Sequence, residues 1–104
     1  MDEVFKALAD RNRRKMLDKL RERAGLTLSE LVDDIGMTRQ SASRHVSVLE
    51  NAGLVVTHWS GREKLHYLNP VPVVEISERW IDKFSRDKAV SLLSLKSALE
   101  DQEK

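Results

Sequence analysis

Residues 38–49 read TRQSASRHVSVL, and this stretch decides the fold. Thr38 is a good helix N-cap, because a threonine hydroxyl can accept a hydrogen bond from a free backbone N–H of the first turn. Ala42, Val46 and Leu49 follow at the three- and four-residue spacing of one helix side. The pattern predicts a helix over residues 39–52 that buries these three side chains and leaves a polar side of Arg, Gln, Ser and His uncovered.

The segment before this helix predicts another helix and a tight turn. Thr27 and Glu30 have the spacing of a capping box, in which each side chain bonds to the backbone N–H of the other residue. Gly36 can end this helix in the left-handed conformation, and only Met37 separates it from Thr38. Two helices joined by a short turn that contains glycine are typical of a helix-turn-helix motif.

The flanking segments add helices before this motif and a hairpin after it. Residues 2–8 predict a short helix, and Asp10 can cap a second one that runs to about residue 23. Residues 54–59 and 64–69 are rich in β-branched and aromatic side chains and enclose the turn sequence SGRE, which predicts a β-hairpin. The helical pattern resumes at residue 73. We therefore expect a mostly α fold with a two-stranded β wing, which is a winged helix-turn-helix.

The composition fits a single globular domain and excludes several kinds of site. The chain has 104 residues, of which 40% are apolar and 34% charged. It has no cysteine, so disulfides, thiolate metal sites and cysteine nucleophiles are excluded. Residues 1–10 are acidic and amphipathic, unlike a secretory signal, and no apolar run reaches the length of a membrane span. We expect a cytoplasmic protein.

The polar side of the helix over residues 39–52 has side chains suited to DNA. Arg and Gln match the major-groove edges of guanine and adenine, and Ser can bond to bases or phosphates. Such a stripe is usually a solvated face, but this one follows a helix-turn-helix and precedes a hairpin with two cationic residues, so we interpret it as a DNA-binding surface. His45 lies on its flank, where packing and hydrogen bonding within the protein are favoured and a phosphate contact is the alternative. The predicted DNA-binding residues are Thr38, Arg39, Gln40, Ser43, Arg44, His45, Ser47, Gly61, Arg62 and Lys64.

Three motifs together resemble the ArsR (arsenic-repressor) family of winged-helix regulators over about residues 4–70. They are ALADRNRRKMLDKL, LTLSELVDDIGMTRQSASRHVSVLENAGLV and GREKLHYLNP. The resemblance implies a homodimeric transcriptional regulator, usually a repressor, that binds a palindromic operator in double-stranded DNA. Two positions depart from the family pattern: Arg11 stands where proline is usual, and His66 stands where an aromatic residue is common.

The resemblance is to a metal-free branch of this family. Many of its metal sensors carry a Cys-x-Cys pair in the third helix, where this sequence has Val32 and Asp34. Zinc and arsenite sites of that type need thiolates. Glu75, Glu78 and Asp82 share a helical face, but we interpret them as a solvated acidic stripe. We therefore expect neither a metal site nor a cofactor.

An apolar stripe continues along the C-terminal helices, where a small winged domain has little core left to cover. In the family that the sequence resembles, the first and last helices build the dimer interface. We therefore expect one domain over residues 1–104, with the helix-turn-helix and wing in about residues 4–70 and dimerisation helices in residues 71–104. The predicted dimer-interface residues are Val4, Phe5, Leu8, Ile76, Trp80, Phe84, Leu92, Leu95 and Leu99.

Two other classes of function are alternatives to DNA binding. A winged helix can instead serve as a protein-interaction or RNA-binding module, but such a module would show an apolar stripe where this helix has Arg, Gln and Ser. An enzyme is not expected, because the chain has no glycine-rich phosphate loop and no metal-ligand cluster. Ser43, His45 and Glu50 lie on one short helix and cannot form a catalytic triad. The sequence identifies neither the operator nor an effector.

Overall fold

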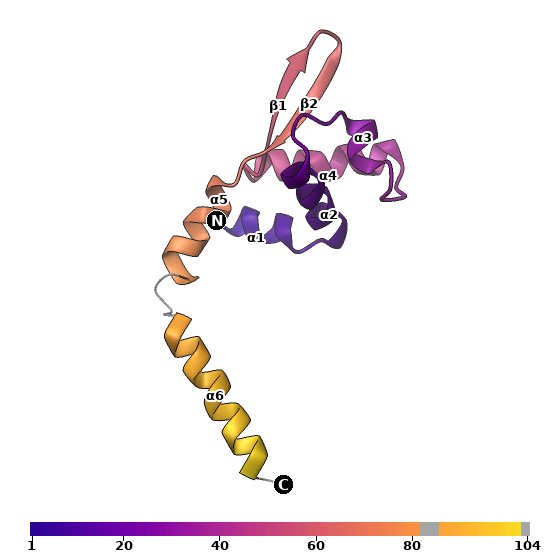
Figure 1. The fold of residues 1–104 in the computed structure, drawn as a ribbon. Coiled ribbons are helices and arrows are strands. Elements are labelled where there is room, and N and C mark those ends of the chain that lie inside the picture. The colour runs from indigo at the N-terminus through magenta and orange to yellow at the C-terminus, as the bar shows by residue number, and fades with distance from the viewer. Residues whose placement is uncertain (82–85, 103–104) are drawn as a thin grey trace. The chain divides into compact units, whose positions relative to one another are not determined.

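The computed structural model describes residues 1–81 and 86–102, and the chain falls into two compact units, Met1–Pro72 and Val73–Lys104. The order of four helices and a hairpin in the first unit confirms the predicted winged helix-turn-helix. In chain order its elements are α1 (Asp2–Leu8), α2 (Arg11–Glu22), α3 (Leu28–Val32), α4 (Arg39–Asn51), β1 (Val55–Ser60) and β2 (Glu63–Leu68) (Figure 1).

The core of the first unit lies between α2 and α4, each of which also packs against α1 and α3. Ala42, Val46 and Leu49 are all buried on one side of α4, as their spacing predicted. Met16 on α2 and Leu31 on α3 are fully buried against them. The remaining apolar core residues are Val4, Ala7, Leu17, Leu20, Leu26, Leu54 and Val55.

Side-chain caps begin three of these helices, as predicted. Asp10 accepts hydrogen bonds from the backbone N–H groups of Asn12 at 2.8 Å and Arg13 at 3.0 Å. Thr27 and Glu30 form both bonds of the capping box, at 3.1 and 3.3 Å. Thr38 accepts from the N–H of Ser41 at 3.1 Å. Each cap pairs backbone donors that would otherwise be left unpaired at a helix start.

The third helix is shorter than expected. The sequence predicted a helix that runs to Gly36, but α3 ends at Val32. Beyond it the backbone tightens, because the N–H of Ile35 bonds to the carbonyl of Val32, three residues back. Gly36 then takes a φ of 74°, a conformation that glycine adopts at little cost. The glycine ends the turn that leads to α4 rather than a regular helix.

The cap at Asp10 predicts a pH-dependent contribution to stability. The backbone N–H of Arg13 and the charge of its guanidinium hold the pKa of Asp10 below its usual value. A lowered folded-state pKa means that this stabilisation is present above about pH 4 and is lost as the pH falls through the folded pKa. We expect Asp10→Ala to lower the free energy of unfolding by about 1 kcal/mol at neutral pH, measured by urea denaturation.

The control for this prediction is Asp10→Asn, which keeps a capping oxygen without a titratable group. Asn caps about as well as Asp, so this variant should keep most of its stability at neutral pH. Between pH 5 and 3 the wild-type protein should then lose more stability than Asp10→Asn. Equal losses over that range would show that the ionised Asp10 cap contributes nothing specific.

The wing is an antiparallel hairpin with a two-residue loop. Its register pairs Val55 with Leu68 at the base and Ser60 with Glu63 at the tip. The loop is Gly61-Arg62, and Gly61 has a φ of 62°. A two-residue hairpin loop whose first residue has positive φ favours glycine at that position, because a Cβ would be strained there. The predicted hairpin and its tip are confirmed.

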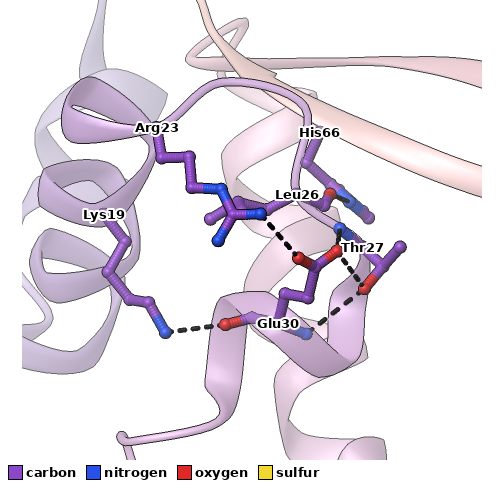
Figure 2. A network of polar contacts seen from close by, with 6 residues as sticks. All are labelled: Lys19, Arg23, Leu26, Thr27, Glu30 and His66. Carbon is purple, nitrogen blue, oxygen red and sulfur yellow. Dashed lines mark hydrogen bonds and ion pairs between the residues drawn. The ribbon is translucent and has the colours of Figure 1, made fainter.

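The base of the wing is hydrogen-bonded to the connection between α2 and α3, a contact that no pattern in the sequence predicts. The backbone N–H of His66 donates to the carbonyl of Leu26 at 2.8 Å, and the N–H of Gly25 donates to the carbonyl of His66 at 2.9 Å. The His66 ring adds a third bond, from Nδ1 to the same Leu26 carbonyl at 2.8 Å (Figure 2). Because a carbonyl can only accept, Nδ1 carries the ring proton.

The segment after the wing holds α5 (Val71–Ile76), a π-helical turn (Ser77–Ile81) and α6 (Arg86–Gln102). Helix α5 begins at Val71 rather than at the predicted residue 73, and the N–H of Val71 donates to Asn69 Oδ1 at 3.2 Å. Five large apolar residues of α6 are exposed on the described chain: Val90, Leu92, Leu93, Leu95 and Leu99. In residues 1–81 and 86–102, no helix is both long and apolar enough to cross a membrane.

Candidate nucleic-acid interface

Helix α4 presents a polar side directly opposite its buried side. A helix turns by about 100° per residue, so Gln40, Arg44 and Ser47 lie across the helix axis from Ala42 and Leu49. These three polar residues are exposed, as are Arg39 and Ser43 on the flank nearer the wing. Five of the predicted DNA-binding residues of α4 therefore share one exposed side of the helix: Arg39, Gln40, Ser43, Arg44 and Ser47. At its start, the exposed Thr38 caps the helix.

A cleft of about 570 Å³ separates α4 from the wing. It brings together five predicted DNA-binding residues from two segments of the chain: Arg39, Ser43, Ser47, Arg62 and Lys64. The other residues that line it are Thr27, Leu28, Ser29, Val46, Glu50, Trp59, Glu63 and His66.

The remaining predicted DNA-binding residues lie outside this cleft. Gln40 and Arg44 are exposed on the polar side of α4, and Gly61 is exposed at the tip of the wing. The first unit therefore offers a polar helix surface and a cleft with cationic side chains on both of its walls.

Comparison with known proteins identifies the family. A family model described as a helix-turn-helix domain matches residues 8–58. The HTH-type transcriptional regulator YuzN of Bacillus subtilis is 41% identical over 87 residues, which cover 78% of this chain and 95% of that protein. The transcriptional repressor SdpR of the same organism is 31% identical over 84 residues, which cover 81% and 91%. The crystal structure of the ArsR family transcriptional regulator RHA00566 matches with a TM-score of 0.70 at 32% identity, covering 79% of this chain and 82% of that one.

The chain belongs to the ArsR family. This confirms the resemblance seen in the sequence, and it makes the protein a transcriptional regulator of the winged helix-turn-helix class.

In this ArsR-family regulator an ion pair crosses the cleft. Lys64 Nζ on β2 lies 3.6 Å from Glu50 Oε1 on α4. The pair neutralises a carboxylate that would otherwise repel phosphates, and it links the wing to the helix. Lys64 is half-buried by this arrangement, whereas Arg62 is exposed at the tip. No pattern in the sequence marks Glu50 as part of the site.

The ion pair predicts that Glu50→Gln strengthens DNA binding. Removing the carboxylate takes away a repulsive charge and frees Lys64 to approach a phosphate. We expect a gain in affinity of about two- to fivefold, the scale of one exposed ion pair. A plot of the logarithm of the affinity against the logarithm of the salt concentration should also become steeper. The change in slope should correspond to about one additional phosphate contact. Both quantities follow from fluorescence anisotropy titrations of a labelled duplex at several salt concentrations.

A matched control for Glu50→Gln is Glu22→Gln, which changes the net charge equally on an exposed position of α2 outside the cleft. It should leave the affinity nearly unchanged. An equal gain in both variants would show that net charge, and not the carboxylate in the cleft, is responsible.

His45 lies on the flank of α4 away from the wing and contacts Arg13 of α2. Arg13 Nη1 lies 3.2 Å from His45 Nδ1, while its Nε and Nη2 donate to the carbonyls of Ala7 and Lys6 at 2.8 and 2.9 Å. A guanidinium only donates, so His45 Nδ1 accepts and the ring proton is on Nε2. Arg13 thus joins the end of α1 to α4. These contacts support a packing role for His45, and DNA contact by this residue stays a prediction.

A polar network fixes the start of α3 against α2 (Figure 2). Lys19 Nζ donates to the carbonyl of Glu30 and pairs with Asp34 Oδ1, both at 2.7 Å, and Arg23 lies 3.4 Å from Glu30 Oε2. The N–H of Thr27 lowers the pKa of Glu30, and the Lys19 ammonium lowers that of Asp34. Exposed pairs of this kind stabilise little individually. Together they hold α3, which precedes α4 in the helix-turn-helix.

The predicted dimer-interface residues differ in their exposure. Val4 is buried in the core of its own chain, and Leu8 and Ile76 are half-buried. Phe5 is 44% exposed and Trp80 38% exposed, with the Arg79 guanidinium 5.5 Å from the Trp80 ring centre. Phe84 lies outside the described residues. The exposed members of α6 are Leu92, Leu95 and Leu99.

In residues 1–81 and 86–102, no three His, Asp or Glu side chains lie close enough together to hold a metal ion.

Proposed function

We propose that this ArsR-family regulator is a homodimeric, sequence-specific DNA-binding repressor. The observation that carries the proposal is the polar side of α4, which stands opposite the buried side of the helix and borders the cleft shared with the wing. A recognition helix needs this arrangement, because its apolar side must anchor it while its polar side meets base edges. YuzN and SdpR are proteins of a bacterium, in which the chromosome lies in the cytoplasm, so we expect this regulator to act there too.

The proposed DNA contacts are of two kinds, contacts to base edges and contacts to the phosphate backbone. Arg44 and Gln40, which are exposed on the polar side of α4, would read base edges in the major groove. The start of α4 at Thr38 offers backbone N–H groups to a phosphate. Arg62 at the wing tip reaches the neighbouring backbone or minor groove. Phosphate contacts of this kind position the protein, and base contacts specify the sequence.

Dimerisation would place two such helices on one face of the duplex. The support is Leu92, Leu95 and Leu99, which are exposed and lie on one side of α6, since exposed apolar residues grouped on one face often mark an interface. Two recognition helices about 34 Å apart would read half-sites one helical turn apart, so the operator would be roughly palindromic. A repressor is favoured over an activator because SdpR, a relative of similar length, is named a repressor.

Fluorescence anisotropy tests the DNA-binding part of this proposal. The protein is titrated into a labelled duplex from upstream of its own gene, with a scrambled duplex of equal length as control, at about physiological salt. A preference of about 10³-fold or more for the native duplex is expected of a specific regulator. Equal and weak binding to both duplexes, followed by a failure to enrich any sequence from genomic fragments, would refute it.

The dimer interface predicts an effect of Trp80→Ala. Trp80 is partly exposed, so only part of its apolar surface is available to a second subunit. We expect the dimer dissociation constant to rise about tenfold, which corresponds to about 1.4 kcal/mol. Sedimentation velocity over a dilution series measures this shift. A variant that stays dimeric at the lowest concentration where the wild-type protein dissociates would remove Trp80 from the interface.

A further inference from the structure

Trp59 on β1 is the largest apolar side chain that lines the cleft. It is not among the predicted DNA-binding residues. It is 63% exposed, which is high for tryptophan, a residue that usually buries most of its surface. Single exposed apolar residues are common and need no function. The position of Trp59 on the wing distinguishes it from that ordinary case.

The register of the hairpin shows which way Trp59 faces. Side chains alternate between the two faces of a strand, so Trp59 shares a face with Val55 and Thr57. Across the hairpin this face continues through His66, paired with Thr57, and Lys64, paired with Trp59. Val55 and His66 are buried in the core. The same face that packs into the core at the base of the wing therefore lines the cleft at Trp59.

The cleft is where a strand of DNA would pass. Its wall on the α4 side carries Arg39 and Ser43, and its wall on the wing side carries Arg62. The pairing of Lys64 with Glu50 shows that this end of the wing is directed at α4. A recognition helix in the major groove and a wing tip at the neighbouring backbone have one sugar–phosphate strand between them. Trp59 stands on the wall of that space.

We propose that Trp59 is a DNA contact in which the indole ring packs on the deoxyribose backbone and its Nε1–H donates to a phosphate oxygen. This rests on the proposed DNA-binding function and adds a residue to it. Tryptophan suits the position because it combines a large flat apolar surface with a single donor. Sugar and phosphate are the same for every base pair, so the contact adds affinity without sequence preference.

Trp59 should differ from the cationic residues of the site in its effect on the salt dependence of DNA binding. The indole neutralises no phosphate, so its removal should leave the salt dependence of binding unchanged. We expect Trp59→Ala to weaken binding about tenfold, the scale of an aromatic contact to a nucleic acid. The loss should be equal on the upstream duplex and on the scrambled duplex. Arg62→Ala, by contrast, should reduce the salt dependence by about one phosphate contact.

A fluorescence experiment tests the contact without removing the residue. Trp59 and Trp80 are the two tryptophans, so Trp80→Phe leaves Trp59 as the single reporter. Its emission and its quenching by acrylamide are measured while a duplex of about 30 base pairs, long enough for two half-sites, is added. Anisotropy of the labelled duplex in the same samples shows independently how much DNA is bound. Trp59→Phe, with Trp80 as reporter, is the matched control.

The expected result is that bound DNA changes the emission of Trp59 and protects it from acrylamide, while Trp80 in the control changes much less. If the anisotropy shows saturation but the exposure of Trp59 to acrylamide is unchanged, the contact is refuted and DNA binding stands. If neither duplex binds at low salt, the proposed function and this inference fail together. If Trp59→Ala binds as tightly as the wild-type protein, Trp59 contributes no affinity and the inference is overturned.

Discussion

Replacing Arg44 with alanine is expected to lower operator affinity by about 1–3 kcal/mol, which is roughly five- to 150-fold. Arg44 lies at the centre of the exposed side of α4, opposite the buried Ala42 and Leu49. Its guanidinium makes no ion pair or hydrogen bond to another side chain or to the backbone within residues 1–81 and 86–102. A guanidinium in that position can bond to both O6 and N7 of a guanine, which is a strong and specific base contact.

The measurement for Arg44→Ala is a pair of anisotropy titrations, one with the operator duplex and one with a scrambled duplex. Loss of a base contact should weaken binding to the operator far more than to the scrambled sequence. The control is Arg21→Ala, which removes the same charge from an exposed position of α2. Similar losses on both duplexes would make Arg44 a phosphate contact, and unchanged affinity would remove it from the interface.

The Arg44 prediction depends on parts of the structure that the sequence could predict. The caps at Asp10, Thr27 and Thr38 and the apolar spacing in α4 are local signals, because the residues that interact lie within one or two turns. The same holds for the hairpin, where Gly61 marks the two-residue loop. Local chemistry thus sufficed to place the polar side of α4 and the tip of the wing.

The sequence could not predict contacts between segments that lie far apart in the chain. The bond from His66 to Leu26 joins residues 40 positions apart and uses a backbone carbonyl, which leaves no pattern in the side chains. The pairing of Glu50 with Lys64 depends on where the wing sits beside α4. Trp59 was recognised only as part of a strand, because its place on the cleft follows from the strand register.

The early end of α3 has a different cause. Leu28, Leu31, Val32 and Ile35 have helical spacing, yet the helix stops at Val32. At Ile35 the backbone makes a tighter turn that bonds three residues back instead of four, and the side chain is only half-buried. Apolar spacing alone does not distinguish these two turns, since both return a side chain to the same side after three residues.

The second large effect is expected for His66→Ala, which should lower the free energy of unfolding by about 3 kcal/mol. His66 is 2% exposed, so alanine in its place leaves an unfilled volume in the core. The substitution also removes the bond from Nδ1–H to the Leu26 carbonyl. That carbonyl keeps its backbone partner, the N–H of His66 itself. The loss therefore comes mainly from packing, because no buried acceptor is left unpaired.

His66→Phe separates packing from hydrogen bonding, and it restores the aromatic character that is common at this position in the family. Phenylalanine fills most of the volume but cannot donate, so it should cost about 1 kcal/mol, the usual net value of one hydrogen bond. Urea denaturation at neutral pH measures both variants. If His66→Phe is as unstable as His66→Ala, the ring bond to Leu26 rather than the filled volume anchors the wing. In that case the wing would be held to the connection between α2 and α3 by the histidine itself, and replacing it with any apolar residue should also weaken DNA binding.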